Sequence, residues 1–125
     1  MQRTPDVTSD DVKRIVSRDF PAESRAAIFD LIDAVTVREK DRVVLACLKV
    51  SDGDLSRLTG NLENAPGYWK EIISEAEYPG ASKQWSKLAD APVEKQEQVY
   101  AADWSQYVEW LTAKCSQSND RSLSN

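Results

Sequence analysis

The chain has 125 residues, of which 41% are hydrophobic and 30% charged, and this composition predicts one folded domain with a single sizeable core. It contains no histidine, so it cannot supply the imidazole that Ser-His relays, Cys-His relays and histidine-ligated metal sites require. The net charge is -5, and residues 63–125 hold six basic and ten acidic groups, which disfavours binding to a phosphate backbone.

Signals for cofactors, metals and membranes are also missing from the sequence. The two cysteines, Cys47 and Cys115, have no disulfide or zinc spacing, and the four glycines are scattered and form no phosphate-binding loop. No apolar leader opens the chain, and no apolar run approaches the roughly 18 residues of a membrane span. We therefore expect a cytoplasmic protein that binds no cofactor, metal or membrane.

The beginning of the chain predicts two helices. A hydroxyl at Thr8 followed by a carboxylate at Asp11 is a helix start signal, and apolar residues then recur at helical spacing as far as about Asp19. Pro21 is expected to open the second helix, because proline is tolerated in a first helical turn.

The segment RVVLACLKV, residues 42–50, is apolar on every side and resembles both a buried strand and a buried helix. The helix is favoured, because the flank VREKD consists mostly of helix formers and no second strand pattern exists to pair with a strand here. A helix that is apolar all round is buried all round, so we expect this one at the centre of the fold.

Further helices are predicted after Gly53, which can close the central helix in the left-handed conformation. Asp54 can cap the next helix, and the sequence NAPGYW, residues 64–69, is expected to break the chain before a fifth one. A turn and a short helix over residues 77–89 lead into a long last helix over residues 92–114.

The predicted fold is therefore all-α: a compact bundle of about six to seven helices with a long C-terminal helix. Residues 1–115 are expected to form a single helical domain. The polar, low-complexity residues 116–125 are expected to form a disordered tail.

One pattern imitates a calcium-binding loop. Asp52, Asp54, Ser56 and Glu63 stand at ligand positions, but Arg57 occupies the position that needs glycine for the sharp turn. A helix cap followed by an amphipathic helix explains the same residues, and no metal site is predicted.

Other candidate catalytic groups also have simpler interpretations. Glu71 and Glu75 could share a helix face and perform acid–base chemistry in a cleft, but surface helices carry such pairs routinely. Cys47 lies in the most apolar segment of the chain and is expected to be an inert core thiol. The sequence thus favours a protein without catalytic activity.

The last predicted helix carries four of the ten aromatic residues of the chain within residues 100–110. At about 100° per residue, one set of large side chains on this helix shares a narrow sector, which indicates a face turned toward the core. This expected inner stripe consists of Val93, Tyr100, Trp104, Tyr107 and Leu111.

Trp110 falls outside that stripe, on a second edge beside Val99. One interpretation is a tryptophan at the margin of the core, with its indole N–H on a polar partner. The other is that Trp110 joins Tyr78 and Trp85 in an exposed aromatic patch that anchors a protein partner. Trp110, Val99, Tyr78 and Trp85 are therefore the predicted binding residues.

Three stretches of the chain resemble a family of short bacterial helical proteins for which no activity is known. They are RVVLACLKVSDGDLSRL, YWKEIISEAEYP and YAADWSQYVEWL, and the resemblance covers roughly residues 10–112. It implies a bacterial, cytoplasmic protein with a helical fold and assigns no function. The chain departs from the family at residues 64–69, where the resemblance implies a charged stretch without proline.

The function favoured by these observations is a non-catalytic protein–protein interaction module, which binds a protein partner or a second copy of itself. One alternative is a small-ligand binder or enzyme that uses carboxylates and tyrosines in an interhelical cleft. A weaker alternative is nucleic-acid association through arginines of the first half. These arginines are Arg14, Arg18, Arg25, Arg38 and Arg42.

Overall fold

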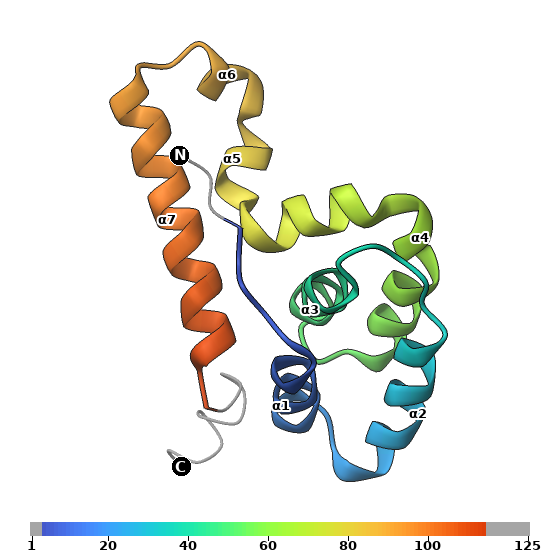
Figure 1. Ribbon diagram of the computed structural model, residues 1–125. Helices are drawn as coiled ribbons and strands as arrows, with labels where there is room; N and C mark the ends of the chain where they lie inside the picture. Colours follow the sequence, from blue (N-terminus) through green and yellow to red (C-terminus); the bar gives the residue numbers. More distant parts are fainter. Residues whose placement is uncertain (1–3, 115–125) are drawn as a thin grey trace.

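A computed structural model describes residues 4–114, and within this range the chain forms seven α-helices and no β-strand (Figure 1). The helices are α1 (Ser9–Asp19), α2 (Ala22–Asp33), α3 (Lys40–Ser51), α4 (Leu55–Glu77), α5 (Pro79–Lys83), α6 (Trp85–Ala89) and α7 (Val93–Thr112). The predicted all-α fold with a long C-terminal helix is confirmed. Cys115 and the tail predicted for residues 116–125 lie outside the described residues.

The main core is built around α3, which packs against α4 and α1, and α2 contributes apolar side chains to the same core (Figure 1). Residues 43–48 of α3 have no exposed surface at all, so the helix is enclosed on every side. The apolar side chains that surround it come from the inner faces of the neighbouring helices, among them Ile15, Ile28 and Leu58. The sequence prediction of a central buried helix is thus confirmed.

We expect Cys47 to resist alkylation while the protein is folded. Its side chain is fully buried, and burial raises the pKa of the thiol to about 12, so almost no thiolate exists near neutral pH. In a Cys115→Ser variant, iodoacetamide should label Cys47 only after urea is added, as measured by mass spectrometry.

The raised pKa of Cys47 also predicts how the stability of the fold depends on pH. The folded-state pKa of Cys47 is raised from an ordinary value of 9.0, so its contribution to stability is complete below that pH and is lost as the pH rises toward 12. Labelling of the folded variant at neutral pH would show that the thiol reaches solvent.

The connection between α3 and α4 is a pair of helix caps. Gly53 adopts the predicted left-handed conformation with φ of 78°, and Asp52 before it does so too, with φ of 52°. The Asp54 carboxylate accepts a hydrogen bond from the Arg57 backbone N–H at 3.0 Å, as expected for an N-cap. The calcium-like pattern therefore spans a cap and the start of α4, which begins at Leu55.

The break predicted at residues 64–69 is a kink inside one helix. Pro66 lies within α4, and Tyr68 has non-helical dihedral angles of -128° and 22°. Proline removes one backbone donor and crowds the preceding turn, which bends the helix without ending it. The expected fifth helix is therefore the second half of α4, which still packs in the main core through Ile73 and then leads to α5 (Figure 1).

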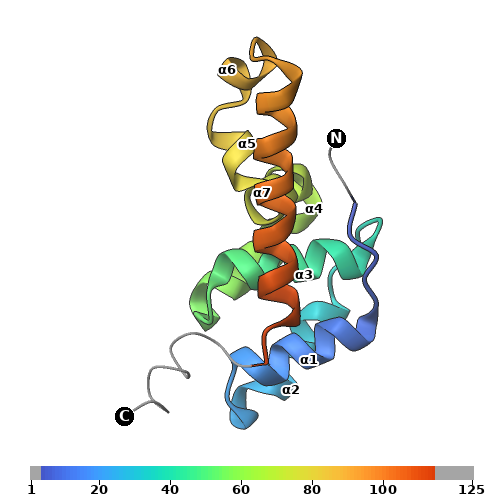
Figure 2. The same cartoon turned by 90° about the vertical axis from the view of Figure 1, so that its left-hand side faces the viewer.

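The segment predicted as a turn and one short helix forms two short helices, α5 and α6, separated at Gln84. They pack against α7, and a small apolar cluster forms among Ala81, Leu88 and Val99. Helix α7 runs from α6 at one end of the molecule to α1 at the other (Figure 2). The C-terminal helices thus form an arm with its own small core.

The inner face of α7 differs from the predicted stripe. The buried residues of α7 are Val99, Asp103 and Tyr107, whereas Val93 is 70% exposed. The buried set is rotated toward the edge that contains Val99, because Asp103 must face α5 to bond its backbone amides. Angular spacing of apolar residues could not reveal this requirement, since it concerns a buried carboxylate.

Candidate functional site

The predicted binding residue Trp110 packs inside the molecule. It is half-buried against the main core, and its ring lies 5.6 Å from the Tyr107 ring. The Arg18 guanidinium lies 5.2 Å from the centre of the indole, at cation–π distance. These contacts account for the position of Trp110 at the margin of the core.

The other three predicted residues lie together at the opposite end of α7. Val99 is buried in the small cluster, and Tyr78 packs against it. Trp85, at the first position of α6, is 71% exposed. Trp110 follows Val99 by 11 residues, or about 16 Å along a helix axis. The structure therefore groups Tyr78, Trp85 and Val99 and separates them from Trp110.

A cavity of about 320 Å³ opens beside this group, between the end of α4 and helices α5, α6 and α7. We call it the α5–α7 groove. Its lining contains no charged side chain and consists of Ser74, Tyr78, Ala81, Ser82, Trp85, Leu88, Ala89, Gln96 and Tyr100. A volume of this order is within the range of sites that hold a small molecule or one large side chain.

The walls of the groove are held by internal hydrogen bonds. The Ser74 and Ser82 hydroxyls bond each other, and Ser82 also donates to the Ser74 carbonyl at 3.2 Å, which ties α5 to α4. The Gln96 side-chain amide donates to the carbonyls of Leu88 and Ala91 at 3.0 Å each, which fixes the turn between α6 and α7. The groove is therefore a preformed feature of the fold.

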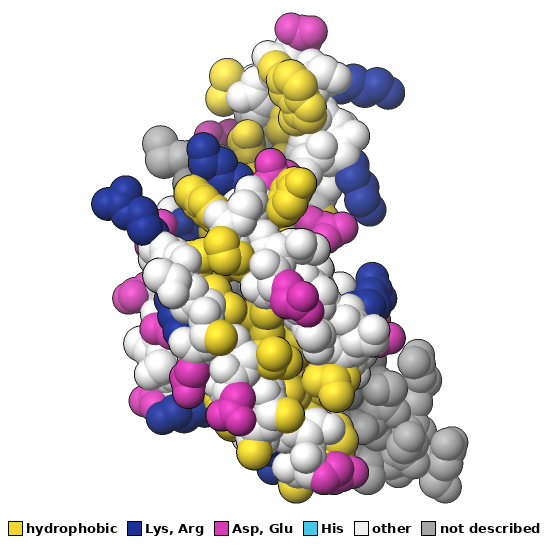
Figure 3. All heavy atoms as spheres, turned by 90° about the vertical axis from the view of Figure 1, so that its right-hand side faces the viewer, with side chains coloured by type: hydrophobic (Ala, Val, Ile, Leu, Met, Phe, Trp, Pro, Cys, Tyr) yellow, Lys and Arg dark blue, Asp and Glu magenta, His cyan; other side chains and the backbone are white. Residues whose placement is uncertain are grey.

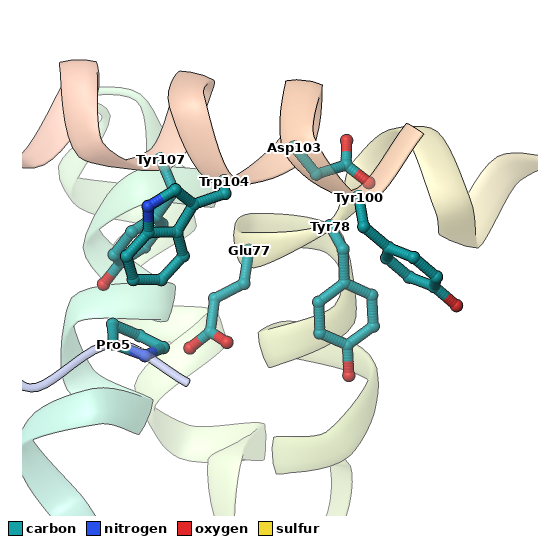
Figure 4. Close-up of a pocket in the computed structure, with 7 residues that line it drawn as sticks. All are labelled: Pro5, Glu77, Tyr78, Tyr100, Asp103, Trp104 and Tyr107. Carbon is teal, nitrogen blue, oxygen red and sulfur yellow. The ribbon is translucent and has the colours of Figure 1, made fainter. Parts of the chain in front are cut away.

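A second, much smaller cavity of about 10 Å³ shares Tyr78 and Tyr100 with the groove (Figure 4). Its volume is about that of one water molecule. Two carboxylates line it, and its full lining is Pro5, Glu77, Tyr78, Tyr100, Asp103, Trp104 and Tyr107. A substrate could not enter a space of this size.

Glu77 is engaged in a buried ion pair. Its carboxylate accepts two hydrogen bonds of 2.7 Å from Nε and Nη2 of Arg42, in the parallel arrangement that guanidinium and carboxylate groups favour. The Glu77 side chain is 4% exposed and that of Arg42 15%. The bond to Glu77 raises the pKa of Arg42, which favours the charged guanidinium in this pair.

Asp103 is engaged as well, and it positions α5. Its two oxygens accept hydrogen bonds from the backbone N–H groups of Gly80 and Ala81 at 2.8 and 2.9 Å. A Cβ atom at residue 80 would lie 2.7 Å from Oδ1 of Asp103, so any larger residue there would force the Asp103 carboxylate to shift. Asp103 thereby holds the helix that carries Ala81 and Ser82 into the groove wall.

We expect Tyr107→Phe to leave the free energy of unfolding unchanged or to raise it by up to about 1 kcal/mol. The Tyr107 hydroxyl is buried and has no hydrogen-bond partner among the described residues, and burial raises its pKa. Urea unfolding followed by circular dichroism measures the change. A loss above about 1 kcal/mol would show that the hydroxyl makes a favourable bond.

The arginines proposed for nucleic-acid contact are mostly bonded within the molecule. Arg14 and Arg18 donate to carbonyls at the end of α7, Arg25 to carbonyls near the end of α1, and Arg42 to Glu77. Each of these guanidinium groups has a structural role that a phosphate would have to replace.

Within residues 4–114, no three potential ligand side chains from His, Cys, Asp or Glu gather at one point. None of the helices in that range combines the length and the hydropathy of a membrane span.

Tyr78, Trp85 and Val99 could be found from the sequence as aromatic or apolar residues in excess of the core. Tyr100, Ser82 and Gln96 were missed, because Tyr100 was assigned to the inner stripe and the other two carry no signal beyond being polar residues near a turn. No family model, curated protein or solved structure matches this chain, so the resemblance to short bacterial helical proteins stays a prediction.

Proposed function

We propose that the protein is a non-catalytic interaction module that binds a protein partner through the α5–α7 groove. The observation that carries this proposal is Trp85, which is 71% exposed at the margin of a cavity of about 320 Å³ without charged lining. An exposed tryptophan beside an apolar pocket is the usual composition of an interaction hot spot. A large side chain of the partner would fill the groove and cover the indole.

Binding without catalysis is supported by the state of the buried carboxylates. Glu77 and Asp103 line the small cavity beside Tyr78 and Tyr100, and both carboxylates accept two structural hydrogen bonds. The space that they line is too small for a substrate, and the larger groove contains no carboxylate. We also propose a cytoplasmic location, which is supported by the unpaired, buried Cys47.

A small-molecule ligand is the second candidate for the same groove. Its volume and its mixture of aromatic and hydroxyl groups suit a neutral, partly aromatic compound. Such a ligand would depend on the inner residues Tyr78 and Tyr100 more than on Trp85, because Trp85 stands at the exposed margin. Comparison of the Trp85 and Tyr100 variants therefore separates the two candidates.

The test is capture of partners from the native lysate with the wild-type protein and a Trp85→Ala variant. We expect Trp85→Ala to reduce recovery of a specific partner by at least about tenfold. Tyr68→Ala is the matched control, since Tyr68 is 59% exposed but lies at the kink of α4 and outside the groove. Equal recovery with wild type, Trp85→Ala and Tyr100→Ala would exclude the groove as the contact surface.

A further inference from the structure

We infer that the partner segment of the α5–α7 groove is acidic, with a large apolar side chain that enters the groove and carboxylates on either side of it. This inference rests on the proposed function and names the chemistry of the partner. It comes from the distribution of charge around Trp85, which differs from that of the whole chain.

The side of the groove margin that α5 and α6 form is basic. Lys83 and Lys87 stand two residues before and two residues after Trp85, and both are exposed. Neither ammonium group forms an ion pair with another residue of the described chain. Helices α5 and α6 carry these two cations and no acid, in a chain whose net charge is -5. The nearest following acids, Asp90 and Glu94, come after α6.

The interior of the groove determines which part of the partner enters. Its lining has no cation, and a carboxylate placed there would lose its hydration without an opposite charge. The side chain that enters is therefore apolar, and the partner's charges stay at the margin, where the lysines are exposed. Figure 3 shows one face of the molecule, with hydrophobic side chains at its upper end and both Lys or Arg and Asp or Glu side chains around them.

The same charges argue against a second copy of this chain as the occupant. Two molecules of net charge -5 repel each other at long range. Local attraction to the two lysines requires a partner segment that concentrates negative charge near its anchor. Such attraction acts mainly on the association rate and on the salt dependence of binding.

The experiment uses three short synthetic peptides and the full-length protein. The first has a central phenylalanine flanked by Asp and Glu, the second has Asn and Gln in place of the acids, and the third keeps the acids but has alanine at the centre. Binding is measured by the change in tryptophan fluorescence of the protein, in about 50 mM and about 500 mM salt.

We expect the acidic phenylalanine peptide to bind about tenfold more tightly than either of the others at low salt, with the advantage over the neutral peptide lost at high salt. Lys83→Ala combined with Lys87→Ala should remove that advantage and leave the neutral peptide unaffected. Lys13→Ala, which removes an exposed lysine of α1 at the opposite end of the molecule, is the matched control.

Each other outcome overturns the inference. Equal binding of the acidic and neutral peptides, abolished by Trp85→Ala, would reject the acidic partner and leave the groove as an interaction surface. Equal binding of the phenylalanine and alanine peptides would reject the apolar anchor. No Trp85-dependent binding of any peptide would reject the inference altogether, while the lysate experiment decides the proposed function separately.

Discussion

Arg42→Ala is expected to lower the free energy of unfolding by about 3–5 kcal/mol. The substitution leaves the Glu77 carboxylate buried, with its two 2.7 Å hydrogen bonds broken and its opposite charge removed. Glu39 is the other acid within reach of Arg42. Its side chain is 59% exposed and already in contact with water, so the loss of this ion pair contributes little to the destabilisation. Urea unfolding monitored by far-ultraviolet circular dichroism gives the change directly.

The double variant Arg42→Met with Glu77→Met is the control for this interpretation. Replacing a buried ion pair by apolar residues of similar volume is often neutral or stabilising. The free energy of unfolding should therefore fall less in the double variant than in Arg42→Ala alone. A loss below about 1 kcal/mol for Arg42→Ala would mean that water reaches the Glu77 carboxylate once the arginine is gone.

Arg18→Ala is expected to destabilise the fold by about 3–4 kcal/mol and to loosen the end of α7. Arg18 forms a buried ion pair with Asp19, in which the side chains are only 4% and 8% exposed. It also donates to the carbonyls of Trp110 and Ala113, which have no helical partner beyond the end of α7, and it stacks on the Trp110 ring. Urea unfolding measures the loss, and a red shift of tryptophan emission should accompany it.

Arg14→Ala provides the comparison on the same helix. Arg14 donates to the Leu111 carbonyl at 2.7 Å, but its side chain is 45% exposed, so its removal should cost at most about 1 kcal/mol. Arg18→Lys keeps the positive charge but loses the planar guanidinium group with its several donors. Its free energy of unfolding should therefore lie between those of the wild type and Arg18→Ala. If Arg14→Ala and Arg18→Ala lowered the free energy of unfolding by the same small amount, the stability of the end of α7 would not depend on the buried Arg18–Asp19 pair.

Features of the fold that depend on neighbouring residues could be predicted from the sequence. The central helix follows from an apolar segment without a partner strand, and residues 43–48 are fully buried as expected. The left-handed pair Asp52 and Gly53 closes α3 and Asp54 caps α4, because both signals act within one turn of the chain. Pro66 indicated an interruption correctly, but its sequence context could not decide between a kink and a break.

Features that join distant segments could not be predicted. The bond from Arg18 to the Trp110 carbonyl spans 92 residues, and the bond from Gly80 to Asp103 spans 23. Without these pairings, the sequence showed no partner for Trp110 and no role for Asp103. The candidate site shows the same limit: Trp85 and Tyr78 could be named, but the cavity beside them depends on how α5 and α6 pack on α7.

The junction between α4 and the arm has a consequence for how the molecule opens. Both halves of α4 pack in the main core, through Leu62 before the kink and Ile73 after it, and only its C-cap Tyr78 also packs against the small cluster, so main core and arm are two packing units joined at Tyr78. The small cluster of Ala81, Leu88 and Val99 contains far fewer apolar side chains than the core around α3. Sub-global unfolding can therefore release α5 and α6 while α3 remains enclosed, and the groove belongs to the less stable of the two units.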